Sequence, residues 1–263
     1  YQEVTGVQTC ALPISSFSAD VDVTTLTVGN TVANVSLTGS GSSVTNAVTF
    51  GNDGTLTIGD ASGDTFTFDG GLTVSTASST LAGSIDSSND AISFGAITLA
   101  AATTLDTNAS STAGDIAIGA VTGSNNNLTL DTTTSTGSAD HTFTGDINLG
   151  SGALSVTGDA VLGANVSITA TGGITFNDAI NADNASSNDR TLTMTSGTGS
   201  TITVIGTVGN SQALAGLTIT QSIGTSFNSA IDVSDSNSGT ITLTDTQDNS
   251  NIVFSGEIGR AHV

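Results

Sequence analysis

The sequence predicts an all-β fold, a parallel β-helix (β-solenoid) with about 25 residues per rung, from three observations. A short word of apolar residues alternating with threonine recurs from one end of the chain to the other. A longer repeat recurs at spacings of 23 to 33 residues. No segment has the apolar spacing of three and four residues that indicates a helix.

The short word is apolar-Thr-apolar, followed by Gly, Asn or Asp. Alternation with period two places the apolar side chains on one face of a strand and the threonines on the other. Strands this short cannot each bury an apolar face alone, but a stack of them can. The copies are Leu26-Thr27-Val28, Leu56-Thr57-Ile58, Phe66-Thr67-Phe68, Leu72-Thr73-Val74, Leu128-Thr129-Leu130, Leu192-Thr193-Met194, Ile202-Thr203-Val204, Leu217-Thr218-Ile219 and Ile241-Thr242-Leu243.

The longer repeat is apolar-x-Phe/Val, a few small residues, then Ile or Val. One or two further strand words lie between its copies, such as Leu154-Ser155-Val156. Each rung should therefore hold two or three strands, and nine or ten rungs would be roughly 45 Å long at about 4.8 Å per rung. The central residues of the copies are Phe94, Ile118, Phe143, Phe176, Val204, Phe227 and Phe254.

Two segments could have suggested other folds. Ala100-Ala101-Ala102 is the nearest candidate for a helix, but it joins Ile97 to Leu105 in a strand-like run. A string of β-sandwich modules would need tight hairpins, and only Asp53-Gly54 and Asp69-Gly70 have the favoured turn sequence. The repeat is also too short for sandwiches of about 100 residues.

The alternation also predicts which side chains form the core. The inward apolar stack should run through every rung from about Phe17 to Gly256. Its expected members are Val28, Ile58, Phe68, Val74, Phe94, Ile118, Leu130, Val156, Phe176, Val204, Ile219 and Leu243.

Both ends of the chain match a translated sequencing adapter. Residues Val4 to Ile14 read VTGVQTCALPI, and Glu257 to Val263 read EIGRAHV; one common adapter encodes these two segments in its two orientations. We therefore predict artefacts at residues 1–15 and 257–263 and a β-helix fragment over residues 16–256. A fragment cut inside a solenoid is expected to associate end to end, and the adapter-coded tails are expected to pack poorly.

The composition limits the partners. The chain has 23 acidic residues against two Lys or Arg, for a net charge of −21. Binding to nucleic acid or to an anionic membrane surface requires basic residues, so neither partner is expected. Between the predicted adapter segments there is no Cys, which fits an extracellular bacterial repeat protein stabilised by stacking.

The stretch from Thr191 to Ser234 carries a family resemblance. It contains Gly197-Thr198-Gly199, Thr201-Ile202-Thr203-Val204 and Ala213-Leu214 leading into Leu217-Thr218-Ile219-Thr220. These words resemble the repeats of bacterial β-strand-repeat surface proteins of the filamentous haemagglutinin and autotransporter type. The resemblance implies a right-handed parallel β-helix that forms a non-catalytic stalk or adhesive repeat of a large secreted or outer-membrane-associated bacterial protein. Its partner would be a host-cell, matrix or neighbouring-cell surface.

Catalysis is not expected from the few reactive side chains. His141 follows Asp140, and neighbours on a strand point to opposite faces, so the pair cannot form a triad; we expect an exposed His at a loop-to-strand junction. Arg190 should be a solvated charge. Carbohydrate-active enzymes of this fold remain an alternative, although the segment between the tails lacks the Tyr and Trp that serve as sugar platforms.

Two binding functions stay open as alternatives. Calcium takes oxygen ligands, and weak candidates are Asp53, Asp60, Asp64 and Asp69 in one Gly-rich stretch and Asp232 and Asp235 in another. Capping of turns is the competing role for these Asp residues. Ice binding would need aligned Thr-x-Thr motifs on one flat face, and the variable spacing opposes it. The motifs are Thr65-Phe66-Thr67, Thr191-Leu192-Thr193, Thr201-Ile202-Thr203, Thr218-Ile219-Thr220 and Thr240-Ile241-Thr242.

Overall fold

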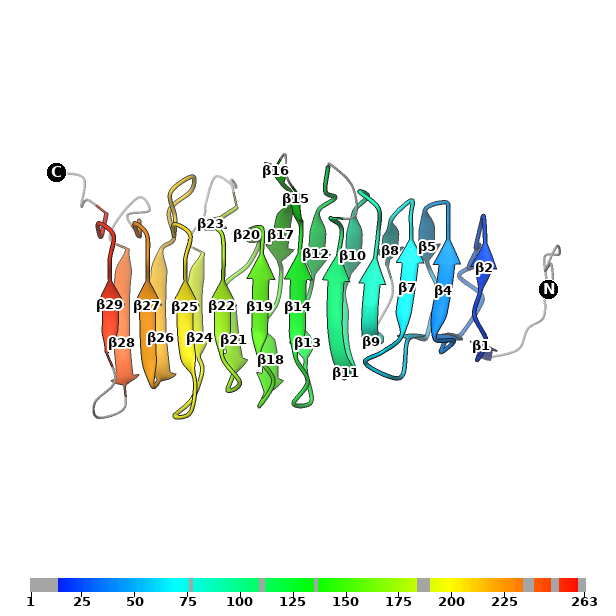
Figure 1. The fold of residues 1–263 in the computed structure, drawn as a ribbon, viewed down its shortest axis with the longest axis horizontal. Coiled ribbons are helices and arrows are strands. Elements are labelled where there is room, and N and C mark those ends of the chain that lie inside the picture. The colour runs from blue at the N-terminus through cyan, green and yellow to red at the C-terminus, as the bar shows by residue number, and fades with distance from the viewer. Residues whose placement is uncertain are drawn as a thin grey trace.

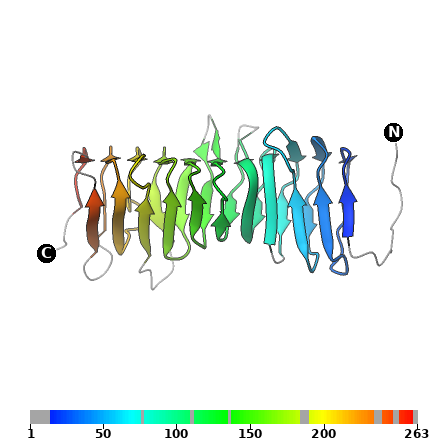
Figure 2. The same cartoon turned by 90° about the horizontal axis from the view of Figure 1, so that it is seen from below.

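A computed structural model describes residues 14–75, 78–108, 112–134, 137–183, 190–233, 239–246 and 251–259. These residues form an all-β solenoid of about nine turns, with rungs about 24 residues apart, as the sequence predicts. Figures 1 and 2 show the strands standing side by side along the long axis, with the two chain ends at opposite ends of the stack. No helix long and apolar enough to cross a membrane occurs in the described ranges.

Three faces make up each rung, and on each face the strands pair in parallel with the rungs before and after. Two long strands, β9 (Ser78–Asp86) and β11 (Ala96–Asp106), run through the first face and on into the second, which merges these faces into one 20-stranded sheet. The other first-face strands are β1 (Ile14–Phe17), β3 (Asn34–Leu37), β6 (Thr55–Ile58), β13 (Val121–Thr122), β18 (Ile147–Gly150), β21 (Val166–Ala170), β24 (Thr191–Thr195), β26 (Gly216–Ser222) and β28 (Thr240–Thr246).

The second face contains the strands that lead up to the corner at the upper edge of Figure 1. They are β2 (Asp22–Val23), β4 (Gly41–Val44), β7 (Thr65–Phe68), β14 (Leu128–Asp131), β19 (Leu154–Thr157), β22 (Ile174–Phe176), β25 (Thr201–Val204), β27 (Gly224–Phe227) and β29 (Ile252–Phe254).

The third face is a seven-stranded parallel sheet, which isolated bridges through Val208, Ile231 and Ile258 extend toward the C-terminal end. Its strands are β5 (Val48–Phe50), β8 (Leu72–Val74), β10 (Ile92–Phe94), β12 (Ile116–Ile118), β17 (Asp140–Phe143), β20 (Asp159–Leu162) and β23 (Ile180–Ala182). A short antiparallel hairpin, β15 (Thr133–Thr134) and β16 (Gly137–Ser138), projects from the corner before it (Figure 1).

The core is a set of continuous side-chain columns, because in-register parallel pairing places equivalent residues of successive rungs above one another. Most strands are buried at alternate positions, as in the pattern of β22. The longest second-face column begins at the buried Ser42 and is apolar in every later rung, through Phe66, Ile85, Leu105, Leu130, Val156, Phe176, Val204, Phe227 and Phe254. The Ala100-Ala101-Ala102 segment lies inside β11, so the prediction of a strand there is confirmed.

Ten of the twelve expected core residues are buried, and the two exceptions belong to the end rungs. Val28 is only partly buried. The expectation that Leu243 is buried is wrong, since its side chain is 45% exposed. Leu243 pairs with the buried Ile219 and so shares its inward column. It is exposed because, in the described part of the chain, no further strand stacks on β28.

The copies of the longer repeat lie on two different faces, so the expectation of one continuous repeat is wrong at one step. Phe94, Ile118 and Phe143 lie on the third face, where the partner of Phe143 in the next rung is Leu162. Phe176 lies instead on the second face, above Val156. The 33-residue step from Phe143 to Phe176 therefore crosses from one face to another, since apolar-x-Phe words occur on both.

Backbone pairing continues into both predicted adapter segments. Strand β1 begins at Ile14, and Ile258 bridges to Ile231 although its side chain is 51% exposed. Main-chain amide and carbonyl groups pair whatever side chains they carry. Such pairing is therefore compatible with a segment that was never selected to complete a rung.

Candidate functional site

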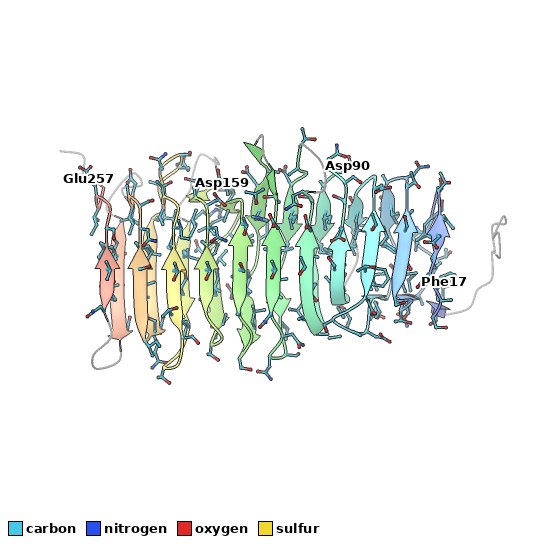
Figure 3. All side chains as sticks on the ribbon, in the orientation of Figure 1. Phe17, Asp90, Asp159 and Glu257 are labelled. Carbon is cyan, nitrogen blue, oxygen red and sulfur yellow. The ribbon has the colours of Figure 1, made fainter. Side chains whose placement is uncertain are left out.

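Aspartates gather along the corner between the second and third faces, although they are far apart in sequence. Asp86 pairs in register with Asp106, and Asp106 with Asp131. Across the same corner Asp140 pairs with Asp159, and the carboxylate of Asp115 accepts the backbone N–H of Asp140 at 3.1 Å. Figure 3 shows Asp90 and Asp159 on this one long edge of the solenoid. We call these six residues the carboxylate stacks: Asp86, Asp106, Asp131, Asp115, Asp140 and Asp159.

Partial burial raises the pKa of three of these groups. Partial burial raises the pKa of Asp86, against a hydrogen bond from Ser84 that lowers it. Desolvation also raises the pKa of Asp106 and of Asp140, and the charges of their stacked neighbours raise it further. A raised folded-state pKa contributes stability that is present at low pH and is lost as pH rises through that pKa. Asp86, Asp106 and Asp140 therefore destabilise the fold at neutral pH, and this destabilisation is removed as they are protonated.

Several Asp and Asn side chains at the corners have a structural partner, a backbone N–H of a neighbouring rung. Asn34 Oδ1 accepts the N–H of Thr55 at 2.9 Å, and Asp146 Oδ1 accepts that of Ser167 at 2.8 Å. These bonds satisfy amides at or near the starts of strands, such as Thr55 of β6 and Ser167 of β21, and they fix the register between rungs. Equivalent acceptors are Asp20, Asp115, Asn125, Asn127, Asp159, Asn165 and Asn181.

The first set of calcium candidates does not converge on one point. Asp64 is buried, and its Oδ2 accepts the backbone N–H groups of Asp60 and Ala61, both at 2.9 Å, which caps a turn. The side chains of Asp53 and Asp60 are exposed. Asp69 Oδ1 accepts a hydrogen bond of 2.7 Å from the Ser88 hydroxyl in the next rung.

The second set is only partly described. Asp232 is half-buried in the turn after the Ile231 bridge, and its backbone carbonyl accepts the N–H of Leu214 at 3.3 Å. Asp235 lies outside the described residues. Within the described ranges, no group of three or more His, Cys, Asp or Glu side chains is placed to hold a metal ion.

His141 is fully buried, so the expectation of an exposed histidine is wrong. It occupies an otherwise aliphatic third-face column, between Ile116 in one rung and Ala160 in the next. Along β17 the side chain of Asp140 points outward and that of His141 points inward. The two neighbours therefore face opposite sides, as the sequence predicts, but it is the histidine that enters the core. The burial separates the imidazole from solvent and from any substrate.

The hydrogen bonds of His141 define its protonation. Nε2 lies 2.9 Å from the Thr157 carbonyl oxygen, which can only accept, so Nε2 carries the hydrogen. Nδ1 is then a buried acceptor, and it has no hydrogen-bond partner. Desolvation lowers the pKa of His141, outweighing the Thr157 hydrogen bond and the charges of Asp131, Asp178 and Asp159, which raise it.

Arg190 is paired rather than freely solvated, which corrects the sequence expectation. Its Nη2 and Nε donate to the two carboxylate oxygens of Asp183 at 2.7 and 3.1 Å, and its side chain is 27% exposed. The bidentate pair joins Asp183, which directly follows β23 on the third face, to Arg190, which directly precedes β24 on the first face.

The Thr-x-Thr motifs are divided between two faces. Thr65–Thr67 and Thr201–Thr203 lie on the second face in β7 and β25, and the other three motifs lie on the first face in β24, β26 and β28. On the first face Thr193, Thr218 and Thr242 stack in register over three rungs. The column of register partners two residues before them is Thr191, Gly216 and Thr240, so a glycine interrupts the threonines there.

Sequence reasoning did not find the carboxylate stacks or the contacts of His141. Their members are separated by unequal loops, so only the strand register brings them together. Comparison of the chain with protein-family models, with curated proteins and with solved structures finds no match.

Proposed function

We propose that this chain is a non-catalytic structural segment, a stalk or adhesive repeat, of a large secreted or cell-surface bacterial protein. The observation that carries the proposal is the unbroken column of apolar side chains through successive rungs, of which Phe66 to Phe254 is the longest. Such a stack gains length by adding rungs, with each rung stabilised by its neighbours.

The polar groups support a structural role. Corner Asp and Asn side chains are engaged with backbone amides, and the only described arginine is paired with Asp183. The imidazole of His141 is enclosed in the core. A net charge of −21 on the chain keeps neighbouring stalks apart at low ionic strength.

The complete gene tests this proposal most simply. We expect further solenoid rungs together with a secretion signal and a transporter or anchoring domain. A gene that encodes an intracellular protein, or that joins these rungs to a catalytic domain on which they form a substrate cleft, would contradict the proposal.

We expect this chain to associate end to end with copies of itself. The described residues leave the outer edges of β28 and β29 unpaired, and the inward-column residues Leu243 and Ile258 are 45% and 51% exposed there. Unpaired parallel edges template further strands. Repulsion between copies weakens as the Debye length falls from about 10 Å at 0.1 M salt to about 3 Å at 1 M. Light scattering should therefore show the particle mass rising with salt.

Acidification should also increase end-to-end association, and the increase should begin at a pH above the pKa of an ordinary aspartate. Because the pKa values of Asp86, Asp106 and Asp140 are raised, these groups lose their charge above the pH at which ordinary aspartates do. Ile258→Asp should suppress the association, whereas Thr98→Asp, on an outward mid-stack position, should not. A wild-type chain that stays monomeric through both series would contradict this expectation.

A further inference from the structure

The hairpin β15–β16 is held to the solenoid at its base by a buried polar contact. Thr132, the residue before the hairpin, is fully buried, and its Oγ1 donates to the carbonyl of Ala139, the residue after it, at 2.7 Å. The Thr132 N–H donates to the Thr157 carbonyl of the next rung at 2.9 Å. The contact therefore joins the two ends of the hairpin and fastens both to the stack.

His141 completes this contact from inside the core. Its Nε2–H lies 2.9 Å from the Thr157 carbonyl oxygen and 3.2 Å from Thr132 Oγ1, so one imidazole N–H faces both groups. Gly158 leaves room for the ring: its φ is +115°, and a Cβ there would lie 2.0 Å from Thr132 Oγ1 and 3.0 Å from His141 Nε2. The arrangement depends on a neutral ring, because Nδ1 points to no acceptor.

The preceding rung has an equivalent threonine contact at the same corner but no histidine beside it. One rung earlier, Thr107 Oγ1 donates to the Gly114 carbonyl, and the Thr107 N–H donates to the Asp131 carbonyl at 3.0 Å. The residue that corresponds to His141 there is Ile116. The threonine closure therefore forms without an imidazole, and the contact at Thr132 differs from the one at Thr107 by the titratable side chain of His141.

We propose that His141 is an acid-sensitive latch: while neutral it seals the contact of Thr132, Ala139 and Thr157 that holds the β15–β16 hairpin, and protonation opens that contact. Protonation places a second N–H donor on Nδ1, where no acceptor lies, and a charge in an aliphatic column. Opening the contact exposes the ring to water and relieves both costs.

The charges that face the ring set the limits of this response. Asp131 on β14, Asp159 on β20 and Asp178 after β22 all favour the protonated ring, and Asp140 is its neighbour on β17. Desolvation exceeds their combined effect, so the folded-state pKa of His141 lies below the ordinary value of about 6.5. The latch is then fully closed above about pH 6.5 and weakens as pH falls toward the lowered folded-state pKa.

Hydrogen exchange of the full chain between about pH 7.5 and 5 tests the latch. After correction for intrinsic exchange, the opening constant at the Thr132 amide should rise by up to about tenfold per pH unit below about 6.5, because opening takes up one proton. The Thr107 amide is the internal control and should show no such rise. His141→Ile, which restores the residue type of Ile116, should remove the pH dependence at Thr132.

Two results would overturn the proposal. One is an opening constant at Thr132 that is independent of pH, or that keeps the same slope in His141→Ile. The other comes from the wild-type chain alone and stands even if the variant fails to fold. An NMR titration in which the His141 ring titrates at or above its value in the urea-unfolded chain, or carries its neutral hydrogen on Nδ1, contradicts the latch.

Discussion

Phe176→Asp should abolish or nearly abolish folding of the rungs around β22. Phe176 is 1% exposed, sits in the middle of the second-face column and packs against Phe143 with ring centroids 6.4 Å apart. Removing a buried Phe side chain costs about 3–5 kcal/mol. An unpaired carboxylate at the same place adds a desolvation cost that makes the total exceptional among single substitutions.

Neighbouring Thr175 supplies the matched control. It points outward on the same strand, between Ser155 and Thr203 of the adjacent rungs. Thr175→Asp adds the same charge to the solvent side and should change the free energy of unfolding by about 1 kcal/mol or less. Thermal and urea unfolding of both variants gives the comparison. Equal stability of Phe176→Asp and wild type would show that the inward assignment of this strand is wrong.

The sequence predicts the fold well because two signals agree. Period-two alternation identifies the inward residue of nearly every strand, and the absence of helical spacing leaves a stacked β architecture. Burial of Phe68, Ile118, Leu130 and Val204 follows from alternation alone. Leu243 fails for a reason that no local pattern contains, namely that burial in a solenoid also needs a neighbouring rung.

Register between rungs is harder to derive from the sequence, because loops of unequal length separate similar words. The side chain of Asn34 accepts a hydrogen bond from a residue 21 positions later, whereas that of Asn125 accepts one from a residue 26 positions later. The word around Phe143 resembles the one around Phe176, yet they lie on different faces. Loops absorb the differences in length while the strands stay aligned, so constant spacing is not a requirement for stacking.

The polar contacts between rungs depend on the register, so they cannot be predicted where the register cannot. Asp86, Asp106 and Asp131 form a stack only once their strands are paired. For His141, the sequence indicates that it and Asp140 face opposite ways, but not which of them faces inward. The signal that could have decided this is Phe143, two residues on, since alternate residues share a face and the Phe belongs to the core.

Removing whole rungs tests the central claim, that this chain is a modular stack whose rungs are equivalent units of length. Ile97 pairs with Val121, and Val121 with Ile147, so deletion of residues 97–146 excises two rungs and joins Ala96 to Ile147 in register. Deletion of residues 97–127 joins Ala96 to Leu128 instead. That control deletion is shorter, but it places the second-face strand β14 where a first-face strand belongs.

Small-angle X-ray scattering at low salt, combined with thermal unfolding, measures both outcomes. The account predicts that the chain without residues 97–146 folds cooperatively, keeps the cross-section of the wild type and is shorter by about 10 Å, two strand spacings. It predicts that the chain without residues 97–127 loses this rod shape. Loss of folding in the in-register deletion, or equally good folding of the two deletions, would contradict the account.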